Sequence, residues 1–269
     1  MKNFLSCLRL NMKSALITSA YKYIPLITVC LFSCLQLWIR RDYADLTWAD
    51  YVFWMNKGMP FPKDDAIIIP DGVWVFFYAY LLVMTGTYLS RSDSGICRLE
   101  LLKAGSRRVW LFSKYVTCIA LTLVYFLTAY ASIGIFSAVF GTLSIQDSSV
   151  AAQYLDMTYV RTAAGFNMLE SAAFSVVCAA ALISVFFLVT HLFKAVFAYA
   201  VCSGLLIYTV YTKAPAYPGN LLMFRRCADS GAQLVMLLVC VVTCVIAAVA
   251  LDVFRRDAFA KYAQAWRLG

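Results

Sequence analysis

The side chains best suited to polar chemistry gather in one charged stretch, residues 91–114, which reads RSDSGICRLELLKAGSRRVWLFSK and lies between two long apolar runs. The Ser-Asp-Ser triplet at 92–94 offers hydroxyl and carboxylate oxygens that can cap the first turn of a helix. Apolar side chains then recur at three-residue spacing, at Ile96, Leu99 and Leu102. The pattern predicts a short amphipathic helix that lies along a membrane surface.

A turn and a second helix are expected directly after it. Gly105 provides a helix stop, and Ser106 can cap the helix that follows. The first turns of this second helix carry cations and an aromatic side chain, at Arg107, Arg108 and Trp110. Lys114 marks the point where we expect the helix to enter the membrane. The alternative interpretation is an ordinary basic loop between two membrane spans.

Familiar catalytic motifs are missing from the sequence. It contains no G-x-x-x-x-G-K-[ST] phosphate loop, no H-E-x-x-H pair and no G-x-S-x-G elbow. His191 is the only histidine, so a two-histidine metal site cannot be built. Most cysteines lie inside apolar runs, where cysteine behaves as a small hydrophobe: Cys30, Cys34, Cys118, Cys178, Cys202, Cys240 and Cys244. We expect no catalytic, cofactor or metal site in this chain.

Composition places the chain in the membrane class. Of its 269 residues, 63% are hydrophobic and 14% are charged, whereas a soluble domain carries roughly 25% charged residues. Apolar runs near 20 residues are long enough to cross a bilayer core about 30 Å thick. Six such runs occur, at 24–39, 72–90, 115–141, 168–190, 195–212 and 231–251. The predicted fold is therefore all-α, a single transmembrane domain over residues 1–269 with six membrane-spanning helices.

The distribution of Lys and Arg predicts the side that each loop occupies, because cytoplasmic loops collect basic residues. With six spans, the N-terminus, the loops 91–114 and 191–194 and the tail 252–269 share one side. That side holds 15 of the 23 basic residues and 4 of the 14 acidic ones. Both termini are predicted to be cytoplasmic, in a multi-pass protein of the cell membrane. Since the basic residues are divided among separate loops, nucleic-acid binding is not expected.

Two further segments have predicted roles at the membrane surface. Residues 1–23 carry four cations and no acid, with apolar residues at positions 5, 8, 12 and 16 on one helical face. They predict an amphipathic interfacial helix, and a secretory signal peptide is the alternative. The aromatic-rich loop 40–72 predicts either an interfacial belt or a lid that faces a substrate.

The order of residues in the charged stretch resembles a known family. The residues that carry the resemblance follow a turn-rich segment after the second apolar run: Glu100, Leu101, Leu102, Ser106, Arg107 and Lys114. The order is similar to the first cytoplasmic loop of ABC-transporter permeases of type 2, the export class, which commonly reads E-x-L-x-x-x-P-x-x-R with a lysine further on. Gly105 stands near the position where that family often has proline. The N-terminal amphipathic helix and the six spans extend the resemblance to the whole chain.

The resemblance implies that the stretch 91–114 forms a coupling helix that docks into a groove of a separate ATPase subunit, where ATP and Mg²⁺ bind. The residues then expected to contact the ATPase are Ile96, Leu99, Glu100, Leu102, Lys103 and Arg107. Two permease chains, identical or related, would form the translocation path among membrane lipids. In this family the segment corresponding to 213–230 often dips back into the outer membrane face.

The expected function is export of a hydrophobic or amphipathic cargo, such as a peptide antibiotic, a lipid or a drug, because the spans are apolar and poor in charge. Glu170, near the outer end of the fourth run, is the candidate for substrate contact. The chain is not expected to be an enzyme by itself. The alternatives are a membrane receptor or assembly protein that works without an ATPase, and a membrane-embedded enzyme.

Overall fold

The fold is helical throughout the part of the chain that the structure describes. In this computed structural model the described residues are 2–17, 20–40, 45–62, 69–90, 106–146, 148, 168–193, 195–226 and 230–253. Within these ranges no β-strand forms, and an isolated bridge between Thr47 and Thr142 pairs two extended segments. The predicted all-α class is confirmed.

Six of the α-helices lie over the six apolar runs of the sequence. The α-helices of the described ranges are α1 (Lys2–Met12), α2 (Tyr23–Arg40), α3 (Trp48–Asn56), α4 (Gly72–Ser90), α6 (Arg107–Phe140), α8 (Met168–Leu192), α9 (Ala195–Tyr211) and α10 (Ser230–Val253). Of these, α2, α4, α6 and α8 are long and apolar enough to cross a membrane, whereas the apolar parts of α9 and α10 are shorter. These are helices typical of a membrane-embedded protein, and the number of spans stays a prediction.

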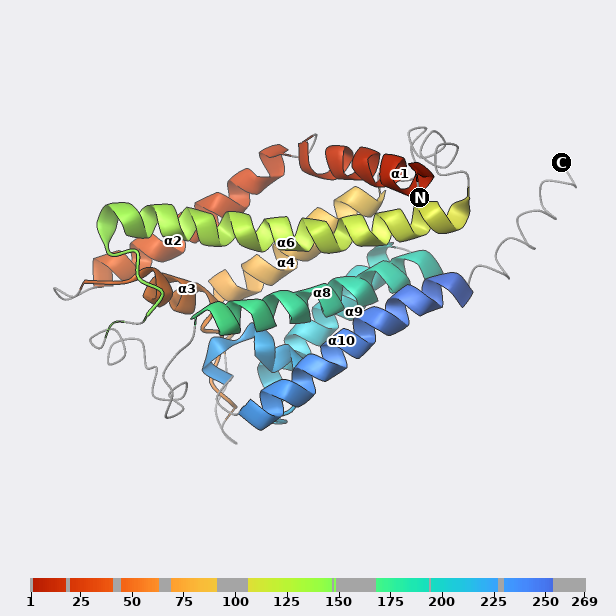
Figure 1. Ribbon diagram of the computed structural model, residues 1–269. Coiled ribbons are helices and arrows are strands. Elements are labelled where there is room, and N and C mark those ends of the chain that lie inside the picture. The colour runs from red at the N-terminus through yellow and green to blue at the C-terminus, as the bar shows by residue number, and fades with distance from the viewer. Residues whose placement is uncertain are drawn as a thin grey trace, which may run out of the picture.

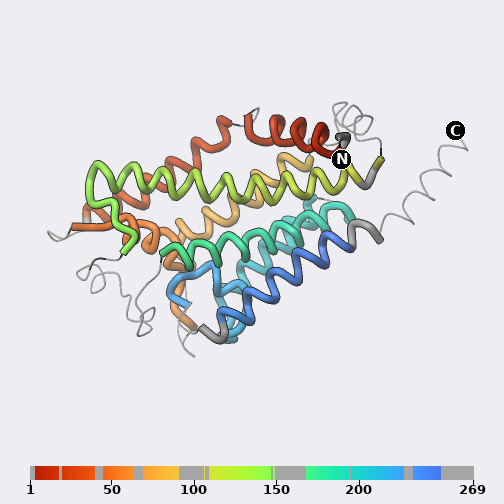
Figure 2. The backbone as a smooth tube through the Cα atoms, in the orientation of Figure 1, coloured from red at the N-terminus to blue at the C-terminus, as the bar shows by residue number. Residues whose placement is uncertain are grey.

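Helix α6 is the longest element, and it runs the length of the molecule without a break (Figures 1 and 2). Its 34 residues span about 51 Å at a rise of about 1.5 Å per residue. It begins at Arg107, so the expected basic and aromatic segment and the third apolar run form one continuous helix. Helices α1 and α2 pack along one side of α6, and α8 packs along another.

An aromatic cluster joins α4 to α6 in the core. The ring centroid of Phe77 lies 5.0 Å from that of Tyr125 and 5.4 Å from that of Phe126. All three side chains are buried, and the Tyr125 hydroxyl donates a 2.7 Å hydrogen bond to the Phe77 carbonyl. Burying a hydroxyl without a partner costs about 1–3 kcal/mol. This bond therefore makes a tyrosine tolerable here, and it fixes the position of α4 along α6.

Helix α8 is the central helix of the C-terminal half, because both α9 and α10 pack against it. Tyr115 of α6 reaches into this half. Its hydroxyl lies 2.9 Å from Ser184 Oγ on α8 and donates to the carbonyl of Cys244 on α10 at 3.1 Å. The cysteines of the apolar runs are free, and all are buried except the half-buried Cys244. Their predicted role as small core residues is confirmed.

The aromatic-rich loop after α2 contains a buried helix, α3, where the sequence predicted an interfacial belt or a lid. Seven of the nine residues of α3 are buried. Thr47 and Asp50 form a capping box, in which the Asp50 carboxylate accepts from the Thr47 backbone N–H at 2.8 Å. The backbone N–H of Trp48 donates to the Thr142 carbonyl at 3.0 Å. Capping and pairing with the chain after α6 hold this helix inward, and the choice between an interfacial belt and a lid stays a prediction.

The two ends of the bundle carry different elements (Figure 1). The start of α1, the end of α4 at Ser90, the start of α6 and the turn after Leu192 lie at one end, which we term the α1 end. The other end, termed the α3 end, holds α3 and two 3₁₀ turns, η5 (Pro218–Leu222) and η6 (Phe224–Arg226). The candidate residues of the sequence are divided between these two ends.

Candidate functional site

The stretch predicted to contact an ATPase is described only from Ser106 onward. Of Arg107, the described feature is its backbone position as the first residue of α6. The other candidates fall outside the described residues: Ile96, Leu99, Glu100, Leu102 and Lys103. The structure describes the two helices that flank this stretch, which we term the frame: α4, which ends at Ser90, and α6, which begins at Arg107. Both of these helix ends lie at the α1 end.

Ser106 caps α6, as predicted. Its backbone is extended, with φ −152° and ψ 148°, and its Oγ accepts a hydrogen bond from the Val109 backbone N–H at 3.3 Å. Such a cap contributes about 1 kcal/mol. Cations are unfavourable in a first helical turn, because the helix dipole places partial positive charge there. Arg107 and Arg108 therefore do not contribute to the stability of α6 through the helix dipole.

Helix α1 is fixed to the first turns of α6 by a buried polar contact. Ser113 Oγ lies 3.1 Å from Cys7 Sγ and accepts a 2.9 Å hydrogen bond from Asn11 Nδ2. The rings of Phe4 and Phe112 pack beside it at 5.7 Å. The face of α1 that docks is therefore the one with Cys7 and Asn11, and the predicted apolar face is left with its Leu5 exposed.

The N-terminal segment also binds the last turns of α4. Lys22 closes a 3₁₀ turn, η2 (Ala20–Lys22), and its Nζ donates to Thr87 Oγ1 at 2.6 Å. The Tyr80 hydroxyl donates to the Lys22 carbonyl at 2.7 Å. Together with the contact at Ser113, these bonds tie the segments 2–17 and 20–22 to both helices that flank the candidate stretch. The N-terminal segment is thus part of the frame that positions this stretch.

Lys114, at which the sequence predicts that the helix enters the membrane, has a buried side chain. Its side chain is 3% exposed, and its Nζ lies 4.3 Å from the centroid of the Trp110 ring. A cation over an indole face is stabilised by the ring quadrupole. Because α1 packs over this part of α6, the lysine side chain is covered by protein, and membrane entry at this residue stays a prediction.

His191 lies on the last turn of α8, at the α1 end, and it is exposed. Its ring stacks on Phe187 with centroids 4.2 Å apart, and its Nδ1 donates to the Phe187 carbonyl at 2.9 Å. Over the described ranges, no group of three or more His, Cys, Asp or Glu side chains lies close enough together to hold a metal ion. These contacts give His191 a structural environment at the end of the helix.

The α3 end contains a buried irregular segment, Leu221 to Phe224, that the sequence associated with a re-entrant region. The segment is almost fully buried, and its carbonyl groups are satisfied by side chains from the helices. The Leu222 carbonyl accepts from Trp74 Nε1 at 2.7 Å, and the Leu221 carbonyl accepts from Ser175 Oγ at 2.8 Å. It therefore folds back among the ends of α4, α8 and α9.

Arg226, a residue that the sequence pattern did not indicate, donates several hydrogen bonds at the α3 end. Its guanidinium is buried, and each of its N–H groups has an acceptor at 2.5–3.2 Å: the carbonyls of Met59, Pro60, Thr209 and Val210 and the side chain of Asn220. Burial lowers the pKa of Arg226 to about 10, so the guanidinium stays protonated at neutral pH.

The acceptors of Arg226 explain what it does. Thr209 and Val210 are in the last turn of α9, where helix carbonyls lack partners within the helix. The positive guanidinium also lies favourably at the negative end of the helix dipole. Met59 and Pro60 belong to the segment after α3. Arg226 therefore fastens the end of α9 to the segment that follows α3.

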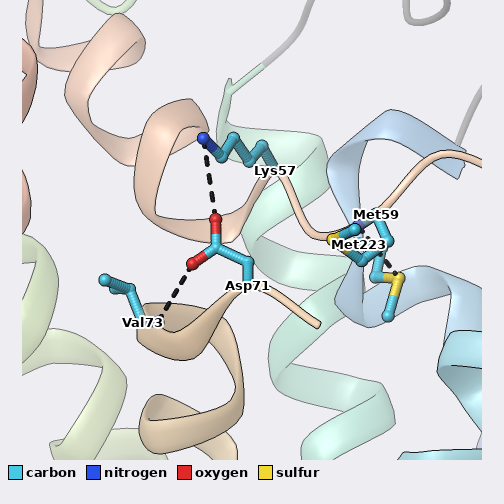
Figure 3. A network of polar contacts seen from close by, with 5 residues as sticks. All are labelled: Lys57, Met59, Asp71, Val73 and Met223. Carbon is cyan, nitrogen blue, oxygen red and sulfur yellow. Dashed lines mark hydrogen bonds and ion pairs between the residues drawn. The ribbon is translucent and has the colours of Figure 1, made fainter. Parts of the chain in front are cut away.

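A second set of contacts fixes the same segment to α4 (Figure 3). Lys57 forms a 3.6 Å ion pair with Asp71, whose carboxylate also accepts from the backbone N–H of Val73 in the first turn of α4 at 3.0 Å. The Met59 backbone N–H donates to Met223 Sδ at 3.5 Å. Segments 57–59 and 71–73 and residue 223, far apart in the sequence, thus form one structural unit at the α3 end.

Glu170, the candidate for substrate contact, lies in the first turn of α8 and is exposed. A carboxylate is favourable there because of the helix dipole. Figure 1 places the start of α8 at the α3 end, away from the start of α6. The structure therefore does not bring Glu170 together with Arg107, and substrate contact by Glu170 stays a prediction.

The contacts of Arg226 and the inward docking of α1 were not predicted from the sequence. Arg226 could not be found from its neighbours in the chain, because its acceptors come from three separate segments. The inward docking of α1 has a weak signal, Asn11 and Cys7 four residues apart on one helical face. Comparisons of the chain with protein-family models, with curated proteins and with solved structures found no match.

Proposed function

We propose that this chain is the membrane-spanning subunit of an ATP-driven exporter of the ABC type-2 class. In this proposal it crosses the cell membrane six times with both termini in the cytoplasm. It pairs with a second permease chain, identical or related, and binds ATPase subunits that hold ATP and Mg²⁺. The cargo is hydrophobic or amphipathic, such as a peptide antibiotic, a lipid or a drug. The observation that carries the proposal is the order of Glu100, Leu102, Ser106 and Arg107 between two long apolar helices.

The arrangement of α4 and α6 supports a coupling role for this stretch. Residues 91–105 lie between the end of α4 and the cap of α6, with no further described element between. A displacement of the stretch therefore acts directly on two helices long enough to cross a membrane. Rigid-body movement of such helices is a common way to exchange two states of a protein.

The N-terminal segment supports the same role. Its contacts at Thr87 and Ser113 lie near the end of α4 and near the start of α6. A force on the stretch would thus move α1 as well. When no force acts, α1 stabilises the arrangement of α4 and α6. The two arginines at the start of α6 add positive charge that does not stabilise the helix. Positive charge at this position would complement an acidic surface on the partner.

A separate energy source follows from the sequence. The chain has no phosphate-binding loop, so an ATP-driven function needs a second protein to bind the nucleotide. The short connection between α8 and α9, from Leu192 to Ala195, lies at the α1 end as well. It offers a second, smaller surface to the same partner.

Affinity purification of the tagged, full-length chain from the organism that encodes it tests the proposal. We expect an ATPase in roughly stoichiometric amount, and we expect Glu100→Arg or Arg107→Glu to weaken its recovery. Lys213→Glu is the control, because Lys213 is exposed at the α3 end and carries the same charge. An intact, purified complex without an ATPase would refute the proposal and would favour a receptor or assembly protein.

A further inference from the structure

A cavity of about 210 Å³ lies between α8, α9 and α10 in the C-terminal half. Helix α8 packs extensively against both α9 and α10, whereas α9 and α10 are not among the extensively contacting pairs of the described residues. The cavity therefore has α8 as its floor and the other two helices as its walls. Residues of η5 line it as well, and η5 lies at the α3 end (Figure 1).

The walls of the cavity are apolar, and their polar side chains already have partners. Thr209 Oγ1 donates to the Leu205 carbonyl, and Thr243 Oγ1 donates to the Val239 carbonyl, both at 2.8 Å. Cys178 Sγ donates to the backbone at the start of η5 at 3.2 Å. A sugar, a nucleotide or an ion would lose its hydration here and gain little in return. The cavity thus selects an apolar occupant.

The size of the cavity is large enough for part of a hydrocarbon chain. A buried apolar cavity of about 150 Å³ stays dry and binds benzene, and the present one is larger. An empty apolar space forfeits the dispersion contacts of its lining. Methylene groups that fill the cavity restore these dispersion contacts. This gain remains even for an acyl chain that comes from a bilayer, for which there is no hydrophobic gain from leaving water.

The lining of the cavity is continuous with an exposed apolar surface. Val239 lines the cavity and is 41% exposed, and it belongs to an exposed apolar face of α10 that includes Leu238, Val242, Val245 and Ile246. The floor helix α8 is itself long and apolar enough to cross a membrane. An acyl chain beside α10 would therefore enter without crossing water.

We propose that this cavity binds one acyl chain of a membrane phospholipid, which enters between α9 and α10 and ends against η5. The bound acyl chain fills the space between α8, α9 and α10. It packs against their side chains as a core side chain would, but it can dissociate. This site does not depend on an ATPase partner. It goes beyond the proposed export function.

Photolabelling of the full-length chain in phospholipid nanodiscs tests the site. The probe is a phospholipid with a diazirine near the end of one acyl chain, and labelled peptides are identified by mass spectrometry. Ala181→Phe and Val185→Phe each place a ring in the cavity from α8. Ala173→Phe is the matched control, because Ala173 is exposed on the same helix and does not line the cavity.

We expect labels on peptides from all three lining helices, and loss of these labels in both filling variants but not in the control. Size-exclusion profiles identify any variant that fails to fold, and the other filling variant then decides. Labelling that both filling variants leave unchanged would overturn the proposal. Labelling by an acylated peptide with the same diazirine, but not by the phospholipid, would also overturn it in favour of a cargo site.

Discussion

Asn11 Nδ2 donates a 2.9 Å hydrogen bond to Ser113 Oγ, which joins two residues 102 positions apart in the sequence. The bond is buried, and it attaches the N-terminal helix to the first turns of α6. Because of this bond, α1 belongs to the frame around residues 91–105. A helix without such a contact would move independently of α6. The contact therefore gives α1 a structural role in addition to its predicted contact with the membrane.

Asn11→Ala is expected to release α1 from α6. Loss of the buried bond and of its packing should lower the free energy of unfolding by about 1–3 kcal/mol. Hydrogen–deuterium exchange should rise in the α1 amides and stay unchanged in α9. Lys13→Ala is the control, because Lys13 is exposed. Equal exchange in α1 for both variants would contradict the assigned role of Asn11.

Arg226→Lys is expected to destabilise the α3 end although it keeps the charge. A lysine has three N–H donors in place of five, so at least two buried acceptors lose their partner at about 1–3 kcal/mol each. We expect a loss of about 3 kcal/mol or more, measured by thermal unfolding in detergent. The neighbouring Arg225→Lys, at a half-buried side chain, should cost less, and an equal cost would contradict the five-bond arrangement.

Asp50 is expected to make stability rise as the pH falls. Burial raises the pKa of Asp50 above its ordinary value of 3.8, and the hydrogen bonds from Thr47 and Ser148 offset this only in part. The folded protein then holds the proton more tightly than the unfolded chain. Its contribution to stability therefore increases as the pH falls through the folded-state pKa, and levels off below about 3.8.

The pH effect can be isolated by comparison with Asp50→Asn, which cannot titrate. The difference in unfolding temperature between the two proteins should shift in favour of the natural one between about pH 7 and pH 4. Both proteins must be folded at pH 7, which circular dichroism establishes. A difference that does not vary with pH would show that the Asp50 carboxyl keeps an ordinary pKa.

Gly58→Ala is expected to destabilise the segment after α3. Gly58 has a φ of 61°, a left-handed conformation that costs about 1–2 kcal/mol for a residue with a Cβ atom. The new Cβ would also overlap the Met223 side chain. The double variant Gly58→Ala, Met223→Ala should recover the part of the loss that comes from overlap. Thermal unfolding measures both, and an unchanged single variant would contradict this backbone assignment.

Much of the helical layout could be predicted from the sequence, because apolar runs in a membrane protein can only be helices or closed barrels. The run 72–90 and the start of 168–190 agree with α4 and α8 to the residue. The Ser106 cap was also found, because capping depends on residues only three positions apart. Local patterns were sufficient wherever the interaction itself is local.

Interactions between distant segments could not be predicted. Lys114 has the sequence of a membrane-entry residue, and only the packing of α1 over it makes it buried. The contacts of Arg226 could not be predicted, since nothing near it in the sequence reveals the acceptor carbonyls at the end of α9. For α3 a local signal did exist, in Thr47 and Asp50 at capping-box spacing.

The length of α6 has a mechanical consequence. A rigid rod of about 51 Å that tilts by about 5° moves its far end by about 4 Å. The far end of α6 leads directly to Thr142, whose backbone is bonded to Leu46 and Trp48 at the start of α3. A small tilt imposed near Ser106 would therefore arrive at the opposite end of the molecule as a displacement of one atom layer, and α3 would have to follow it.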